Sequence, residues 1–109
     1  MNQFFAIFAT DKPDHEPLRR EIRPRHREYL LEPHPHRVVV RLGGPTLSNC
    51  EGIMNGTLLV VEAGSLREAE AFFADDPYAQ AGLFERIEIR PWRWGMGNPP
   101  DGSMSRGEY

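Results

Sequence analysis

The stretch Gly56-Thr57-Leu58-Leu59-Val60-Val61-Glu62-Ala63, followed after Gly64 by Ser65-Leu66-Arg67-Glu68, decides how this chain folds. Its first part is short, apolar and rich in β-branched residues, which is typical of a strand. Its second part has the spacing of a capping box, in which a serine and a glutamate three residues later satisfy orphan backbone N–H groups at a helix start. The stretch therefore predicts a strand that leads directly into a helix. That helix is expected to turn four apolar residues inward, namely Leu66, Ala69, Phe72 and Phe73.

A second strand is predicted just upstream, over Arg37-Val38-Val39-Val40-Arg41-Leu42. It is short and β-branched, and it is expected to end at Gly43-Gly44-Pro45, which has the composition of a turn. Because this strand and the one over 56–63 are neighbours in sequence, the simplest arrangement pairs them antiparallel.

The N-terminal part of the chain predicts one more strand and one more helix. Phe4-Phe5-Ala6-Ile7-Phe8-Ala9 is aromatic and apolar on both alternating faces, as in a central strand, and Thr10-Asp11-Lys12-Pro13-Asp14 follows it as a turn. The segment 14–32 has helical spacing. Its apolar stripe holds Leu18, Ile22, Tyr29 and Leu30, and the charged residues expected on the remaining surface are Arg19, Arg20, Glu21, Arg27 and Glu28.

Pro24 lies inside this predicted helix. A proline ring removes a backbone donor and clashes with the carbonyl four residues back. We therefore expect a kink or a restart of the helix at Pro24, with His26 in the first turn after the break.

With a last strand over 83–94, the order is strand, helix, strand, strand, helix, strand. This is the ferredoxin-like βαββαβ arrangement of the α+β class, an antiparallel four-stranded sheet with two helices on one face. The other sheet face is then uncovered. Because the first strand is apolar on both faces, and Trp92 and Trp94 share one face of the last, the pattern predicts a homodimer in which two such faces pack together.

Composition narrows the class of protein. The chain has 109 residues, 39% of them hydrophobic and 27% charged, as expected for one ordinary globular domain. The formal net charge is −3 and the arginines are interleaved with glutamates, which argues against nucleic acid as a partner. A single cysteine, Cys50, and an N-terminus without signal-peptide features predict a cytoplasmic protein. No apolar run is long enough to cross a membrane.

The domain is predicted to span residues 1–94, and residues 95–109 to form a C-terminal tail. The tail contains Pro99-Pro100 and several glycines, so it cannot bury enough apolar surface to order itself. We expect it to be loose unless it docks on a partner subunit.

Two short strings carry the candidate chemistry: Arg23-Pro24-Arg25-His26 and Asp75-Asp76-Pro77-Tyr78. A histidine held by a carboxylate can transfer protons near neutral pH, because the carboxylate fixes the imidazole tautomer and supports its charged form. His26 and Asp76 are the candidate pair. Arg23 is a candidate for binding a substrate carboxylate through its guanidinium, and Tyr78 for the pocket wall, with its hydroxyl at the pocket edge.

Each of these residues also has a structural interpretation. His26 could pack within the helix and donate a single hydrogen bond. Asp76 could be the N-cap of a short helical turn that Pro77 opens at its first position. Arg23 could be an ordinary solvated cation. For His26 and Asp76 the structural and functional interpretations are compatible.

Metals and nucleotides are not indicated. His34-x-His36 offers two imidazoles without a nearby carboxylate or cysteine, an incomplete ligand set for a metal ion. The glycines at 43, 44, 52 and 56 do not have the spacing of a phosphate-binding loop, so no cofactor is demanded. Cys50 has no adjacent histidine to activate it as a nucleophile.

Several ordered motifs over residues 3–94 resemble the YciI-like (YCII-related) proteins of bacteria. The resemblance rests on Asp11-Lys12-Pro13, Arg23-Pro24-x-His26, Gly44-Pro45, Asp76-Pro77-Tyr78-x-x-Ala81-Gly82-Leu83-Phe84 and Glu88-Ile89-Arg90-Pro91-Trp92. It implies a dimeric α+β barrel and an active site built on a histidine and an aspartate, which map onto His26 and Asp76 here. The loop Glu32-Pro33-His34-Pro35-His36 and the tail depart from the family pattern.

The sequence thus predicts a small homodimeric enzyme that acts on a compact organic molecule without metal or nucleotide. His26 would take or give a proton and Asp76 would orient its ring. Proton abstraction beside a carbonyl, as in an isomerase or an eliminating lyase, suits such a site by analogy with other dimeric α+β-barrel enzymes. Two alternatives remain: a module that binds a small ligand without catalysis, and a dimerisation domain for a larger partner. The substrate and the reaction stay open.

Overall fold

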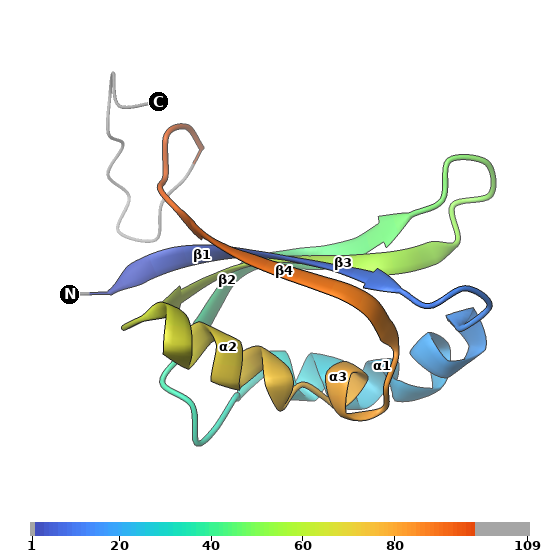
Figure 1. Ribbon diagram of the computed structural model, residues 1–109, viewed down its shortest axis with the longest axis horizontal. Coiled ribbons are helices and arrows are strands. Elements are labelled where there is room, and N and C mark those ends of the chain that lie inside the picture. The colour runs from blue at the N-terminus through green and yellow to red at the C-terminus, as the bar shows by residue number, and fades with distance from the viewer. Residues whose placement is uncertain (1, 98–109) are drawn as a thin grey trace.

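The predicted order of strands and helices is confirmed in the computed structural model, which describes residues 2–97 (Figure 1). The strands form one antiparallel sheet in the order β2-β3-β1-β4, the ferredoxin-like α+β arrangement. One short helix, α3, is added to the predicted set. The elements are β1 (Gln3–Asp11), α1 (Glu16–Leu31), β2 (Val39–Leu47), β3 (Met54–Ala63), α2 (Leu66–Ala74), α3 (Pro77–Gln80) and β4 (Phe84–Trp92).

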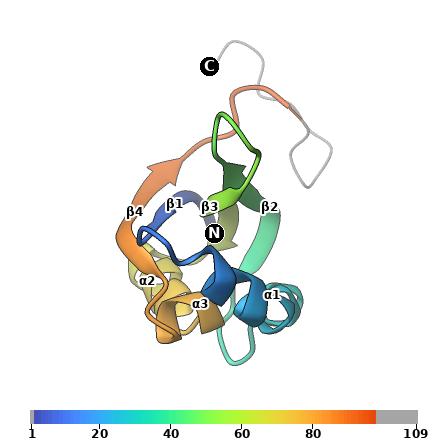
Figure 2. The ribbon, with the colours of Figure 1, turned by 90° about the vertical axis from the view of Figure 1, so that its right-hand side faces the viewer.

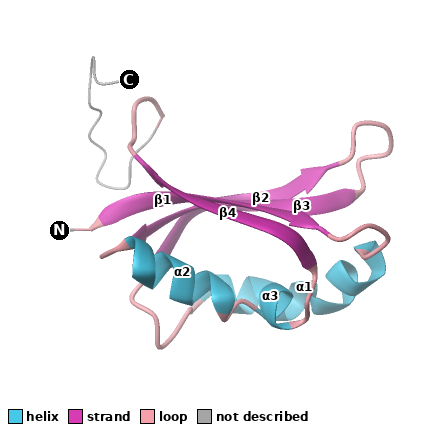
Figure 3. Cartoon of the chain, viewed as in Figure 1, coloured by secondary structure: helices cyan, strands magenta, loops and turns pink. Residues whose placement is uncertain are grey.

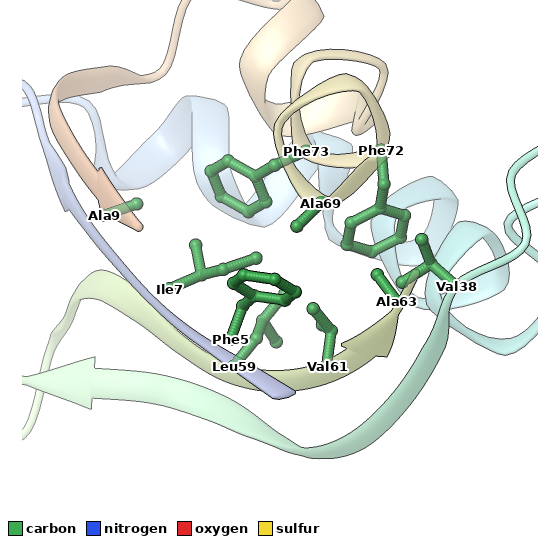
Figure 4. Packing of buried hydrophobic residues seen from close by; sticks show 10 residues of the cluster. All are labelled: Phe5, Ile7, Ala9, Val38, Leu59, Val61, Ala63, Ala69, Phe72 and Phe73. Carbon is green, nitrogen blue, oxygen red and sulfur yellow. The ribbon is translucent and has the colours of Figure 1, made fainter. Parts of the chain in front are cut away.

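The helices form a single layer beneath the sheet (Figure 3). Viewed from the end, α1 lies below the β2 side of the sheet and α2 below the β4 side (Figure 2). Alternation along the strands produces this layering, because every second residue of β1 and β3 faces the helices. Ten of the buried apolar residues between the layers are drawn in Figure 4: Phe5, Ile7, Ala9, Val38, Leu59, Val61, Ala63, Ala69, Phe72 and Phe73.

The predicted capping box at the start of α2 is present on the serine side, whereas the glutamate bonds the residue before the cap. The Ser65 hydroxyl oxygen accepts a hydrogen bond from the backbone N–H of Glu68 at 3.2 Å, and the Glu68 carboxylate accepts one from the N–H of Gly64 at 3.2 Å. Ala69 is buried as predicted, together with Phe72 and Phe73, but the prediction for Leu66 is wrong. Leu66 is 40% exposed because it occupies the first helical position, a full turn before the residues that cover the core.

The predicted turn at Gly43-Gly44-Pro45 is wrong, because β2 continues through it as far as Leu47. Proline is tolerated in this position because β2 is an edge strand, where a missing backbone donor does not break the interior of a sheet. Gly43 permits close packing, since a Cβ atom there would lie 2.6 Å from Leu59 Cδ2. The pairing register of β2 shifts between Val40 and Leu42, which marks a bulge.

The predicted break at Pro24 is also wrong. Helix α1 runs without interruption from Glu16 to Leu31 and contains Pro24 in its interior. Its buried residues are Arg19, Ile22 and His26. Packing against the sheet and α3 therefore outweighs the local cost of the proline.

The sheet face opposite the helices carries a group of apolar residues, which we call the open face: Phe4, Ala6, Phe8, Leu42, Leu58, Val60 and Trp92. Phe8 is 45% exposed and Leu42 is 51% exposed. Phe4 packs edge-on against both tryptophan rings, with centroids 6.5 Å from Trp92 and 6.0 Å from Trp94.

Between residues 2 and 97, no helix has the length and apolar character needed to span a bilayer. The predicted tail 95–109 lies outside the described residues except for 95–97.

Candidate functional site

A cavity of about 380 Å³ opens between α1 and β2 on the helix side of the sheet. One wall is the α1 face that carries His26, and the other is the edge strand with its glycines and proline. Tyr78 of α3 and Thr57 of β3 contribute the remaining polar lining. The lining residues are Arg19, Arg23, His26, Arg27, Leu30, Leu31, Val40, Arg41, Leu42, Gly43, Gly44, Pro45, Thr57 and Tyr78.

His26 and Asp76, fifty residues apart in sequence, meet at this cavity. The imidazole Nδ1 lies 2.9 Å from both carboxylate oxygens of Asp76. The aspartate is fully buried and the histidine nearly so. Because an ionised carboxylate can only accept hydrogen bonds, Nδ1 carries the proton and donates a hydrogen bond to Asp76. In the neutral ring Nε2 is then the free acceptor, so the pair has the arrangement of a general base oriented by a carboxylate.

Asp76 also caps α3. Its Oδ1 accepts a hydrogen bond from the backbone N–H of Tyr78 at 2.8 Å, and Pro77 follows at the first helical turn. The cap fixes the carboxylate relative to the chain, and the histidine uses the same carboxylate. The structural interpretation of Asp76 and its pairing with His26 therefore hold together.

Tyr78 lies against His26 within the site. The two rings stack with centroids 3.9 Å apart and planes inclined by 19°, and the Arg19 guanidinium carbon lies 4.4 Å from the tyrosine ring centre. The tyrosine is completely buried, and its hydroxyl has no hydrogen-bond partner among residues 2–97. Burial raises the pKa of Tyr78, outweighing the opposite influence of Arg19 and Arg23. The hydroxyl is therefore a neutral, unpaired donor.

Arg19 is a site residue that the sequence analysis placed wrongly among the outward-facing charges. It is 2% exposed, and it binds Asp11 through Nε and Nη2 at 2.7 and 2.9 Å. Nη2 also donates to the Thr57 hydroxyl at 2.7 Å. Its spacing in the sequence indicates this position. Arg19 lies four residues before Arg23 and seven before His26, and so on the same helical face as these candidate site residues.

Arg23 is half-buried and lines the cavity, as does the exposed Arg27 one turn further along α1. No ion pair of either residue occurs in the described part of the chain. On the opposite wall, Arg41 is paired with Glu62 at 2.7 Å. Arg23, the anion-binding candidate of the sequence analysis, therefore lies at the cavity, and Arg27 is a further lining arginine that was not singled out from the sequence.

The remaining sequence motifs lie elsewhere. His36 pairs with Asp75 at 2.7 Å, whereas His34 is exposed. Within residues 2–97 no three metal-binding side chains gather in one place. Cys50 is exposed in the loop between β2 and β3 and is absent from the cavity lining.

Comparisons with known proteins agree with this architecture. The family model of the YCII-related domain matches residues 3–93. The proteins named Protein YciI from Escherichia coli O6:H1 and Shigella flexneri are each 31% identical to this chain over 93 residues, which cover 82% of this chain and 95% of the relative.

A solved structure is similar over nearly its whole length. It is 5-chloro-2-hydroxyhydroquinone dehydrochlorinase from Burkholderia phenoliruptrix AC1100 in complex with 2,5-dihydroxybenzoquinone, with 33% identity and a TM-score of 0.74. The match covers 84% of this chain and 95% of that one. The relative therefore shares the fold and binds a small cyclic molecule.

Proposed function

Since the chain belongs to the family of YCII-related domain proteins, we propose that it is a small-molecule enzyme of the isomerase or lyase type. His26 is the proton-transfer residue and Asp76 its orienting partner. The observation that carries the proposal is the placement of His26 Nδ1 at 2.9 Å from both oxygens of a fully buried carboxylate, on the wall of a cavity. We place the enzyme in the cytoplasm, in keeping with its free thiol at Cys50.

The reaction begins when Nε2 of His26 accepts a proton from an atom beside a carbonyl group of the substrate. The electron pair left behind moves onto the carbonyl oxygen and forms an enolate. Return of the proton at another atom completes an isomerisation, and loss of a leaving group such as chloride from the neighbouring carbon completes an elimination. Asp76 stabilises the imidazolium between these steps.

The substrate oxygen gains negative charge during this reaction, and Arg23 is the residue proposed to stabilise it. Arg23 contributes a guanidinium without a carboxylate partner between residues 2 and 97, and Tyr78 contributes a wall of the cavity, since its hydroxyl is buried. Donors that are positioned before the charge develops stabilise it without reorganisation. Both residues act as substrate-binding groups in this proposal.

The test uses the compounds named for the dehydrochlorinase relative. We expect the wild-type protein to release chloride from 5-chloro-2-hydroxyhydroquinone, or to accelerate hydrogen–deuterium exchange at the ring carbons of 2,5-dihydroxybenzoquinone in D₂O. His26→Gln should lower the rate by about 10²- to 10⁴-fold. The matched control is Arg25→Gln, since Arg25 is exposed on the same helix and does not line the cavity. Binding of the quinone without either reaction would favour a ligand-binding module instead.

We propose further that two copies pack through the open face. This face exposes Phe8, Leu42 and Leu58, a hydrophobic surface whose burial stabilises association. Sedimentation equilibrium should give twice the chain mass of 12.5 kDa. Phe8→Asp should produce monomers, whereas Ile53→Asp, at a similarly exposed apolar residue in the loop between β2 and β3, should not.

A further inference from the structure

Three arginines on α1 stand four residues apart and all line the cavity: Arg19, Arg23 and Arg27. Residues at this spacing are neighbours on one helix face, and like charges there destabilise the helix. Asp11 compensates the first arginine. The other two have no ion-pair partner among residues 2–97, so α1 presents two uncompensated positive charges to the cavity.

The exposure of these arginines rises along the helix. Arg19 is buried, Arg23 is half-buried and Arg27 is exposed. The arginine series therefore leads from the interior to the mouth of the cavity, with His26 beside its middle.

The lining contains no aspartate or glutamate that could neutralise a bound cation. Three lining residues each have a carboxylate partner: Arg19 pairs with Asp11, His26 with Asp76, and Arg41 with Glu62. Between the charged groups the wall is apolar, with Leu30 and Val40 among its residues. This combination fits a molecule with an apolar body and more than one oxygen-bearing end.

We infer that Arg23 and Arg27 form a carboxylate-binding site at the mouth of the cavity. Guanidinium groups bind carboxylates with paired, charge-assisted hydrogen bonds, and two of them one helical turn apart can each take one oxygen. The substrate class is then a compact cyclic or enolic molecule with a fixed carboxylate in addition to the carbonyl that reacts. The assignment to a substrate rests on the proposed function, whereas carboxylate binding does not.

The experiment compares two probes that differ only in a carboxylate, 2,5-dihydroxybenzoate and hydroquinone, by isothermal titration calorimetry. We expect 2,5-dihydroxybenzoate to bind at least tenfold more tightly at low ionic strength, and the advantage to shrink in high salt. Arg23→Gln and Arg27→Gln should each weaken its binding about five- to tenfold, and Arg27→Gln should leave the binding of hydroquinone unaffected. Arg27→Lys, which keeps the charge, should restore part of the affinity, and the control Arg25→Gln should match the wild type.

Equal affinity for the two probes would overturn the inference. An equal loss of affinity for 2,5-dihydroxybenzoate in Arg25→Gln and Arg27→Gln would also overturn it, because it would indicate general electrostatic attraction to the helix instead of a defined site. The outcome is separable from that of the proposed reaction. A carboxylate preference in a protein that catalyses neither chloride release nor deuterium exchange supports this site and contradicts the role of His26. Catalysis by a protein that shows no preference for the carboxylate probe would support the role of His26 and contradict the carboxylate-binding site.

Discussion

Asp76 caps α3 and pairs with His26, so replacements that keep one of these interactions and remove the other should separate their contributions. The carboxylate accepts from the backbone N–H of Tyr78 at 2.8 Å and pairs with the His26 ring at 2.9 Å. Asp76→Ala removes both interactions. Asp76→Asn keeps an oxygen for the cap and turns an amide N–H₂ toward His26. The two variants should therefore differ in stability but agree in losing activity.

The expected magnitudes follow from these contacts. Loss of a helix N-cap costs about 1 kcal/mol, and loss of a buried hydrogen bond to a charged group costs about 2 kcal/mol. Asp76→Ala should therefore lower the free energy of unfolding by about 3 kcal/mol. Asp76→Asn retains the cap and a neutral hydrogen bond, so its cost should be about 1 kcal/mol.

Urea unfolding at one fixed protein concentration measures both values. With a slope of about 1.5 kcal/mol per molar, Asp76→Ala should lower the midpoint by about 2 M and Asp76→Asn by less than about 1 M. The asparagine amide favours the tautomer with the proton on Nε2, so Asp76→Asn should still lose about 10²- to 10⁴-fold in rate. ¹⁵N NMR of the His26 ring reports the tautomer. Equal midpoints for the two variants would refute the capping argument, and full activity in Asp76→Asn would refute the orienting role.

Three further predictions concern other parts of the molecule. Burial raises the pKa of Tyr29, so the free energy of unfolding should fall as pH rises above about 10, where unfolded tyrosines ionise. In Tyr29→Phe, the unfolding free energy measured with urea should depend less on pH in this range. Arg19→Met leaves the buried Asp11 carboxylate unpaired and should cost about 3–5 kcal/mol in thermal unfolding, part of which a second change, Asp11→Asn, should restore; no recovery in the double variant would contradict the ion-pair argument. Gly43→Ala places a methyl carbon 2.6 Å from a buried side chain and should cost about 1–3 kcal/mol, whereas Gly44→Ala, with nothing within 4 Å, should be nearly neutral; similar losses would contradict the packing explanation.

The fold could be predicted from the sequence because its elements have clear periodicities. Three signals agree with one topology: the aromatic, apolar run at Phe4–Ala9, the capping box after Ala63 and the helical stripe through Ile22. The errors lie where tertiary packing overrides local preference. Pro24 is accepted inside α1, and Gly43-Gly44-Pro45 is accepted in an edge strand, because each is held by neighbours that are distant in sequence.

The candidate site was partly predictable for a related reason. His26 and Asp76 are residue types whose chemistry is suggestive, and the sequence analysis selected both. Arg19 was missed because an arginine is normally solvated, and its partner Asp11 lies in a stretch with the composition of a turn. Only the three-dimensional pairing shows that this arginine is buried and supports the ring of Tyr78.

The outer margin of β2 bears on how copies of this protein can associate. An edge strand offers unpaired backbone groups to any other chain, but Pro45 has no N–H to donate, and the bulge between Val40 and Leu42 breaks the regular spacing that an incoming strand would need. Addition of strand to strand is therefore disfavoured along this margin. The same irregularities shape one wall of the cavity, so the features that form this wall also protect the protein against growth into extended sheets.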